Sequence, residues 1–223
     1  SPSDALMVSL TIRPPSPSER ASTLPSAWST SLTVREASPP PRPARRSTLP
    51  PAETVPLFDL APSDHALLMY TSGTTGRPKG VVHTHASLLA GGWTPTLAHR
   101  LAPEDHERQV VAVYKIEDLC VSVMMTNVSG GSLAVCSRFS ARNFWADAGR
   151  AEATWFSVVP TIISHLLHGD ADPDAATRSR LRFGRSASSP LAPDVQTAFE
   201  TRFDVPIVET MGLTETAAQI LSN

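Results

Sequence analysis

From about Asp64 onward, the chain alternates short apolar segments with longer segments whose apolar residues recur at helical spacing. The segments "HALLMYTS", "RQVVAVYKI", "GSLAVCSRF" and "RLRFGRSASS" are typical of strands, and "APDVQTAFETRF" is typical of a helix. Strands that alternate with helices over about 160 residues favour βαβ units and a parallel sheet. The sequence therefore predicts an α/β domain over residues 63–223, with helices flanking a mostly parallel sheet.

Single residues predict several boundaries within this domain. Gly91 and Gly92 interrupt the helical spacing of "HASLLAGGWTPTLAHR", and Ser140 is the expected N-cap of a helix in "SARNFWADAGRAEA". In "TWFSVVPTIISHLLHG", Pro160 separates a strand from a helix that ends at Gly169. The segment "DLCVSVMMTNVSGG" fits either a helix or a strand before its glycines, and this alternative stays open.

The first 62 residues have a different composition. They contain 13 of the 21 prolines and no glycine. A segment such as "SPPPRPARRSTLPPAE" lacks the backbone N–H groups for a continuous ladder and the apolar side chains for a core. We therefore expect residues 1–62 to be a disordered or mostly extended Pro/Ser-rich lead. The spacing from Pro40 to Arg45 fits a polyproline ligand of an SH3-like domain, but such spacing arises easily by chance here, and we expect no such role.

Composition and charge exclude several classes of function. The net charge of −2 provides no electrostatic basis for binding nucleic acid or an anionic membrane. No run of 18 apolar residues is present, so we expect no transmembrane helix. The two cysteines, Cys120 and Cys136, lie in apolar surroundings without the spacing of metal ligands, which favours buried thiols in a cytoplasmic protein.

The stretch "LLMYTSGTTGRPKGVVHTH" concentrates glycine and hydroxyl residues between two apolar runs. Its glycines let backbone N–H groups approach phosphate oxygens, its hydroxyls donate hydrogen bonds, and Lys79 adds a positive charge. The common nucleotide-binding loop needs lysine directly after its second glycine, whereas Gly76 is followed by Arg77 and Pro78. A flexible surface turn is the alternative. The preceding strand and the stiffening Pro78 favour a phosphate-binding loop at the carboxyl end of a strand of the parallel sheet.

The sequence "HTH" within this stretch contains two potential metal ligands, His83 and His85. No third ligand is near them in the sequence, and a metal site needs one. Packing at the start of a helix is the favoured interpretation.

Three motifs together resemble those of a known superfamily. "YTSGTTGRPKGVVHTH" resembles the phosphate-binding motif of the adenylate-forming enzymes, which include acyl-CoA and aryl-CoA ligases, luciferase-like enzymes and peptide-synthetase adenylation domains. "RSASSPLAPDVQTAFETRF" resembles their adenine-side turn, and "VETMGLTETAAQ" resembles their Y-G-x-T-E motif. The resemblance covers residues 64–223 and is closest to bacterial-type acyl-CoA ligases. It implies part of the large N-terminal domain of such an enzyme.

The resemblance also implies an activity and its residues. A carboxylic acid would be activated by ATP to an acyl-adenylate and transferred to CoA, with Mg²⁺ as the metal. Thr214 would bind the α-phosphate, Glu215 would hold Mg²⁺, and Lys79, Thr214 and Glu215 would be catalytic. The residues implied around the β- and γ-phosphates are Thr71, Ser72, Gly73, Thr74, Thr75, Gly76 and Lys79, and those around adenine are Ser188, Ser189, Met211 and Gly212.

The sequence departs from the family pattern in two places. Met211 stands where an aromatic residue commonly stacks on adenine, and methionine can cover the ring with less fixed geometry. In "VAVYKIEDLC", Lys115 stands where histidine is usual near the acid, and Asp118 where glycine is usual. Lys115 either pairs with a substrate carboxylate, blocks the acid pocket, or belongs with Glu117 to the surface of an altered loop. Fatty, aryl and short dicarboxylic acids all remain open as substrates.

Family members continue beyond these motifs with a ribose-binding aspartate, a hinge and a small domain that carries a catalytic lysine. We therefore expect a truncated or impaired member that makes no acyl-CoA by itself, with the lead read from a shifted frame as one explanation of its composition. The alternative is a non-catalytic nucleotide-binding or interaction fragment.

Overall fold

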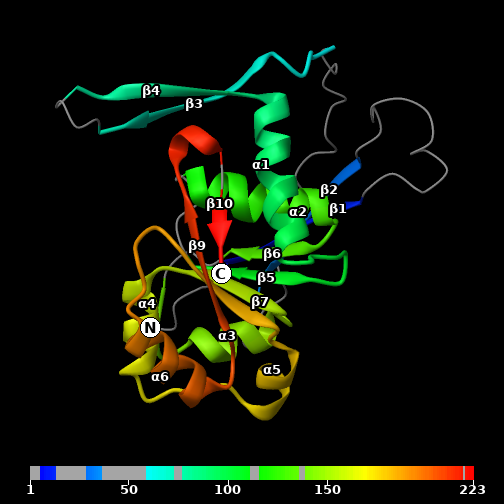
Figure 1. Cartoon of the computed structure of the whole chain (residues 1–223). Helices are drawn as coiled ribbons and strands as arrows, with labels where there is room; N and C mark the ends of the chain where they lie inside the picture. The colour runs from blue at the N-terminus through cyan, green and yellow to red at the C-terminus, as the bar shows by residue number, and fades with distance from the viewer. Residues whose placement is uncertain are drawn as a thin grey trace.

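The computed structural model of the chain describes residues 6–13, 29–36, 59–72, 77–110, 116–135, 139–217 and 219–223. Within these residues, eight strands form one sheet in the order β10-β9-β8-β7-β5-β6-β1-β2 (Figure 1). The strands from β9 to β6 in this order run parallel, and β10, β1 and β2 are antiparallel strands at the two edges. The mostly parallel sheet is therefore confirmed. Its strands are β1 (Leu6–Arg13), β2 (Ser29–Glu36), β5 (His106–Gln109), β6 (Ser132–Val135), β7 (Trp155–Val158), β8 (Phe183–Ser186), β9 (Ile207–Gly212) and β10 (Gln219–Ser222).

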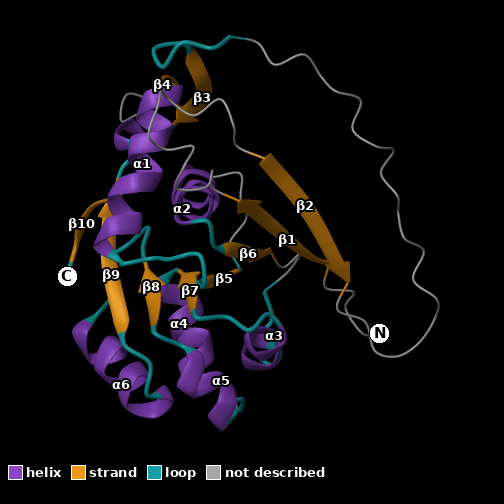
Figure 2. Cartoon of the chain, turned by 90° about the vertical axis from the view of Figure 1, so that its right-hand side faces the viewer, coloured by secondary structure: helices purple, strands orange, loops and turns teal. Residues whose placement is uncertain are grey.

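Helices cover both faces of the sheet, as the two perpendicular views show (Figure 2). One face, here called the upper face, is covered by three helical segments: α1 (His85–Ala98), the π-helical segment η2 (Glu117–Val123) and α2 (Met124–Ser129). The lower face is covered by α3 (Phe144–Arg150), α4 (Pro160–Leu167), α5 (Ala175–Arg180) and α6 (Pro193–Phe203). The sequence leaves the segment 118–131 open between helix and strand. The structure shows that it is helical through Ser129, and the helix ends at Gly130, whose φ of 76° is left-handed.

Side chains of β7 alternate between two apolar clusters, because successive residues of a strand point to opposite faces. Phe156 packs below the sheet with Phe144 and the other aromatic side chains of α3 and α6. Trp155 packs above it, stacked on Phe183 of β8 with ring centroids 5.5 Å apart. Both faces also bury charged groups: below the sheet Arg108 pairs with Asp147 of α3 at 2.9 Å, and above it Glu107 is buried.

The strands β3 (His65–Thr71) and β4 (Lys79–Thr84) pair only with each other, as an antiparallel hairpin that projects from the sheet domain (Figure 1). The expectation of a buried strand in the parallel sheet, with the loop at its carboxyl end, is therefore wrong. A parallel crossover needs about a dozen residues, and the connection 72–78 is shorter. Leu68 and Tyr70 are exposed on the outer face of the hairpin.

The helix α1 is continuous through the two glycines at which the sequence predicts an interruption. Both glycines are buried, and a Cβ atom at Gly92 would lie 2.7 Å from the Cβ of Met124 in α2. Tertiary contact thus explains the glycines, which allow the two helices to approach closely. The N-cap expected at Ser140 is also wrong, since α3 begins after Asn143.

Strands β1 and β2 lie within residues 1–62, for which the sequence predicts a disordered or extended lead. β1 pairs with β6 and so joins these residues to the sheet. The segment from Pro40 to Arg45 lies outside the described residues.

Candidate functional site

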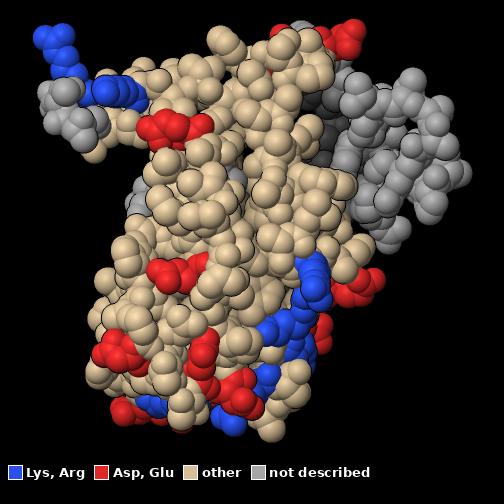
Figure 3. Space-filling model, in the orientation of Figure 1, with Lys and Arg blue, Asp and Glu red and all other residues tan. Residues whose placement is uncertain are grey.

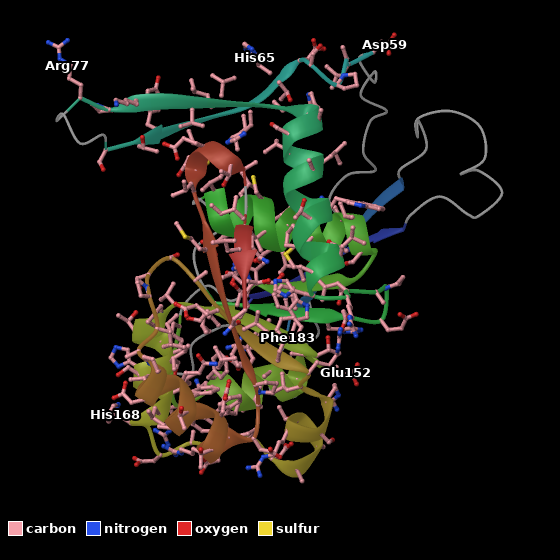
Figure 4. The ribbon with its side chains drawn as sticks, viewed as in Figure 1. Asp59, His65, Arg77, Glu152, His168 and Phe183 are labelled. Atoms are coloured by element: carbon pink, nitrogen blue, oxygen red, sulfur yellow. The ribbon has the colours of Figure 1, made fainter. Side chains whose placement is uncertain are left out.

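The phosphate-binding motif occupies the free end of the β3–β4 hairpin. Thr71, the last residue of β3, pairs with Lys79, the first residue of β4. Lys79 and Ser72 are exposed, and Arg77 points away from the domain at the far end of the hairpin, where positive charge gathers (Figures 3 and 4). The four central motif residues, Gly73, Thr74, Thr75 and Gly76, lie outside the described residues.

The end of β9 and the segment after it carry two of the residues predicted around adenine and the predicted ligands of the α-phosphate and the metal. Met211 and Gly212 end β9 and are exposed, with 52% of the surface of Met211 accessible. A short 3₁₀ helix, η3 (Thr214–Thr216), follows them. Thr214 is half-buried and Glu215 is exposed, so a ligand can approach the Glu215 carboxylate without rearrangement of the chain.

The serine turn lies at the same edge of the sheet as the end of β9. β8 and β9 are parallel neighbours with Ser186 opposite Glu209, so the residues that follow each strand emerge together. Ser188 has a left-handed φ of 73°, and Ser188 and Ser189 are both exposed. The backbone N–H of Leu191 donates to Oε1 of Glu209 at 2.9 Å, which ties the turn to β9.

His83 of β4 joins the hairpin to the segment after β9. Its Nε2 lies 2.7 Å from the carbonyl oxygen of Thr214, and the side chain is 4% exposed. On the other side of the ring, Nδ1 lies 3.4 Å from Oγ of Ser87. Ser87 also exchanges hydrogen bonds with Thr84 in the capping box that begins α1. The packing role predicted for His83 at the start of a helix is therefore confirmed, and it extends to Thr214.

A buried polar network lies on the upper face of the sheet, next to the end of β5. Oε1 of Glu107 accepts a hydrogen bond from Ser122 at 2.6 Å, and Gln109 donates to Ser122 and to Asp118. Among the described residues, Oε2 of Glu107 has no hydrogen-bond partner. Burial raises the pKa of Glu107 to about 8, although Ser122 and Arg185 each lower it. Asp118, which replaces the usual glycine, is thus a buried member of this network.

Arg185 of β8, whose charge acts on Glu107, joins a second group of buried polar side chains that reaches the last strand. Oε1 of Gln219 accepts from Nε of Arg185 at 3.4 Å and from Nε2 of His99 at 2.9 Å. Burial lowers the pKa of His99, and the positive charges of Arg185 and Arg182 lower it further, against the hydrogen bond to Gln219. His99 is the C-cap of α1, so the end of this helix is tied to β8 and β10.

Sequence reasoning did not identify His83, Glu107 or Arg185 as a site-linked residue. The sequence does contain a signal for Glu107 and Arg185. Each is a charged residue inside a short strand whose neighbours in the sheet are apolar, and such a residue is buried when the sheet packs. No local signal pairs His83 with Thr214, which is 131 residues away.

Lys115 and Cys136 lie outside the described residues. Cys120 is a buried free thiol whose pKa is raised to about 11 by burial, so it is not a nucleophile at neutral pH. Among the described residues, no group of three His, Cys, Asp or Glu side chains is arranged to hold a metal ion. The helices in this part of the chain are all too short or too polar to cross a membrane.

Comparison of the sequence with known proteins identifies a family and several relatives. The family model described as AMP-binding enzyme matches residues 9–223, and so reaches further toward the N-terminus than the resemblance over 64–223. The sulfoacetate–CoA ligase of Cupriavidus necator is 46% identical over 168 residues, covering 75% of this chain and 32% of the relative. The oxalate–CoA ligase of Arabidopsis thaliana is 34% identical over 73% of this chain and 32% of the relative. The chain thus spans about a third of the length of these curated relatives.

Solved structures show the same fold. Apo MatB from Rhodopseudomonas palustris superposes with a TM-score of 0.69 at 27% identity, over 76% of this chain and 33% of that protein. O-succinylbenzoate coenzyme A synthetase from Bacillus subtilis, solved in complex with ATP and magnesium ion, superposes with a TM-score of 0.65 at 25% identity. That match covers 74% of this chain and 33% of the synthetase.

Proposed function

Because the chain belongs to the AMP-binding enzyme family, with a match over residues 9–223, we propose that it is an impaired member of the enzymes that activate a carboxylic acid with ATP and pass the acyl group to CoA. The observation that carries this proposal is the convergence of three separate motifs. The serine turn and the end of β9 emerge at one edge of the sheet, and His83 ties the phosphate-binding hairpin to the same place. We also propose a cytoplasmic location, which is supported by two cysteines without the spacing of metal ligands.

The side chains at these positions suit the groups that the reaction requires. Hydroxyls and a lysine suit phosphate oxygens, and Thr71, Ser72 and Lys79 flank the loop that contains Gly73 to Gly76. The backbone oxygen of Thr214 is bonded to His83, while its half-buried side chain remains able to donate to an α-phosphate oxygen.

The adenine and metal positions have matching chemistry. The exposed carboxylate of Glu215 provides the oxygen ligands that Mg²⁺ prefers. The exposed Met211 offers an apolar surface for adenine beside Ser188 and Ser189. When bound, Mg²⁺ supplies positive charge that neutralises the phosphate oxygens.

In the proposed reaction, the acid carboxylate forms a bond to the α-phosphorus while the bond to the pyrophosphate group breaks. Negative charge grows on the α-phosphate and pyrophosphate oxygens. Thr214 stabilises the first by a hydrogen bond and Lys79 the second by its charge, and both effects are strongest where water is excluded. The sulfur of CoA then forms a bond to the acyl carbon while the acyl–oxygen bond to AMP breaks; AMP leaves, and the thiol proton is released to solvent.

We further propose a short acid that carries a second anionic group as the substrate. The relatives named for sulfoacetate and oxalate both act on acids of this kind, and the first is 46% identical to this chain. A lysine at position 115 offers a positive charge to the second anionic group, where the family usually has a histidine. Fatty and aryl acids lack that group and gain nothing from the charge.

Exchange of labelled pyrophosphate into ATP tests the proposal. We expect exchange that depends on sulfoacetate or oxalate and exceeds that with a fatty acid or benzoate. Binding of Mg-ATP without exchange for any acid would favour the alternative, a non-catalytic nucleotide-binding fragment. Absence of both binding and exchange would refute the assignment of the motifs to ATP.

A further inference from the structure

The segment after β9 touches the β4–α1 unit at three successive points, and these three contacts together are here called the clasp. His83 bonds to Thr214, Gly91 packs against Ala217, and His99 bonds to Gln219. α1 runs from the hairpin down to the sheet, and the segment from η3 to β10 runs beside it in the same direction (Figure 1). The clasp therefore consists of three contacts in the same order along both segments.

The middle contact explains one of the two buried glycines. A Cβ atom at Gly91 would lie 3.1 Å from the carbonyl oxygen of Ala217 and 3.2 Å from its Cβ. Ala217 itself has a left-handed φ of 61°, which turns the chain from η3 toward β10. Both features allow the segment to lie close against α1.

The first contact is the one nearest to the proposed chemistry. A carbonyl oxygen only accepts, so Nε2 of His83 donates the hydrogen bond to Thr214. The imidazole is buried, and Ser87, which is fixed in the capping box of α1, lies against its Nδ1. The imidazole is thus held on one side by Ser87 of α1 and on the other by Thr214.

The strand β4 carries Lys79 of the proposed phosphate site and His83, which bonds to Thr214 of the other half. Lys79 begins the strand, and His83 lies four residues later, about 13 Å along an extended chain. The strand therefore links the position of Thr214 to that of Lys79, through the His83 hydrogen bond at one end and Lys79 at the other.

We propose that His83 is a positioning residue that holds the Thr214–Glu215 turn at a fixed separation from Lys79, so that one triphosphate engages both. This inference rests on the proposed function, since it assigns the two ends of ATP to these two segments. A site held in place before the ligand arrives loses less conformational freedom on binding. The advantage applies only to a ligand that spans both segments.

The test measures three ligands on the full chain by calorimetry: Mg-ATP, which spans both segments, and AMP and tripolyphosphate, which each engage one. His83→Leu removes the donor, His83→Gln keeps an N–H at a similar reach, and His65→Leu removes an exposed imidazole from the same hairpin as the control. We expect His83→Leu to weaken Mg-ATP binding about tenfold, the worth of one hydrogen bond. AMP and tripolyphosphate should each change less than about twofold.

His83→Gln should restore most of the Mg-ATP affinity, and His65→Leu should leave all three ligands unchanged. If His83→Leu weakens all three ligands equally, or none of them, the positioning role is refuted while the proposed function stands. If the unsubstituted chain binds none of the ligands, the proposed function is refuted and the inference with it. Should His83→Leu not fold, Gly91→Ala displaces the clasp at its middle contact and must reproduce the selective loss of Mg-ATP affinity.

Discussion

Replacing Glu107 by glutamine should change how the stability of the protein depends on pH. This carboxyl group is fully buried, and burial raises its pKa from 4.5 to about 8, with a smaller increase from Asp118. The hydrogen bond from Ser122 and the charge of Arg185 offset only part of that increase. In Glu107→Gln the amide oxygen can still accept from Ser122, but the side chain no longer ionises.

The magnitude follows from proton linkage. Because the pKa of Glu107 is higher in the folded state, the folded protein holds a proton between pH 4.5 and about 8 that the unfolded chain has released. Stability therefore falls through this window as pH rises, by about 1.4 kcal/mol per pH unit, and is constant with respect to this group outside it. Over the window of about 3.5 units, the loss reaches at most about 5 kcal/mol, and relaxation of the site reduces it to several kcal/mol.

Urea denaturation from about pH 5 to about pH 9 measures the effect, with the fluorescence of the buried Trp145 and Trp155 as the signal. Relative to the unsubstituted chain, Glu107→Gln should gain stability steadily as pH rises. Glu104→Gln, at an exposed position three residues earlier, should give a parallel curve displaced by less than about 0.5 kcal/mol. Parallel curves for Glu107→Gln and the unsubstituted chain would refute the reasoning.

Further substitutions test three regions: the loop, the acid pocket and the packing of α1. Lys79→Ala and Thr75→Val should each weaken Mg-ATP binding by about 1.5–3 kcal/mol, measured by calorimetric titration, because each removes a phosphate contact; unchanged affinity in both would remove the phosphate assignment. Lys115→His should lower sulfoacetate- or oxalate-dependent pyrophosphate exchange and leave Mg-ATP binding unchanged, because it removes the charge offered to the second anionic group; unchanged exchange would place Lys115 outside the acid pocket. Gly92→Ala should destabilise the fold by about 1–3 kcal/mol in urea denaturation, since its Cβ would lie 2.7 Å from the Cβ of Met124; a stability equal to that of the unsubstituted chain would show that α1 can move away from α2.

Local signals in the sequence determined most of the secondary structure from residue 64 onward. Pro160 marks the boundary between β7 and α4 as predicted, because proline suits the first turn of a helix and cannot extend a strand's hydrogen bonding. The motifs around Thr71, Ser188 and Thr214 identify the family, and their order along the chain implies a common site. These inferences depend only on residue type and spacing, which a sequence displays directly.

The tertiary structure decided between alternatives that fit the same local signal equally well. An apolar run such as "HALLMYT" suits a parallel strand or a hairpin equally, and the short connection to β4 selects the hairpin. Gly91 and Gly92 look like a helix break until Met124 and Ala217 are brought against them. The buried state of Glu107 and the bond from His83 to Thr214 arise between elements far apart in the chain. Local periodicity contains no information on such contacts, because they depend on which faces of the folded elements meet.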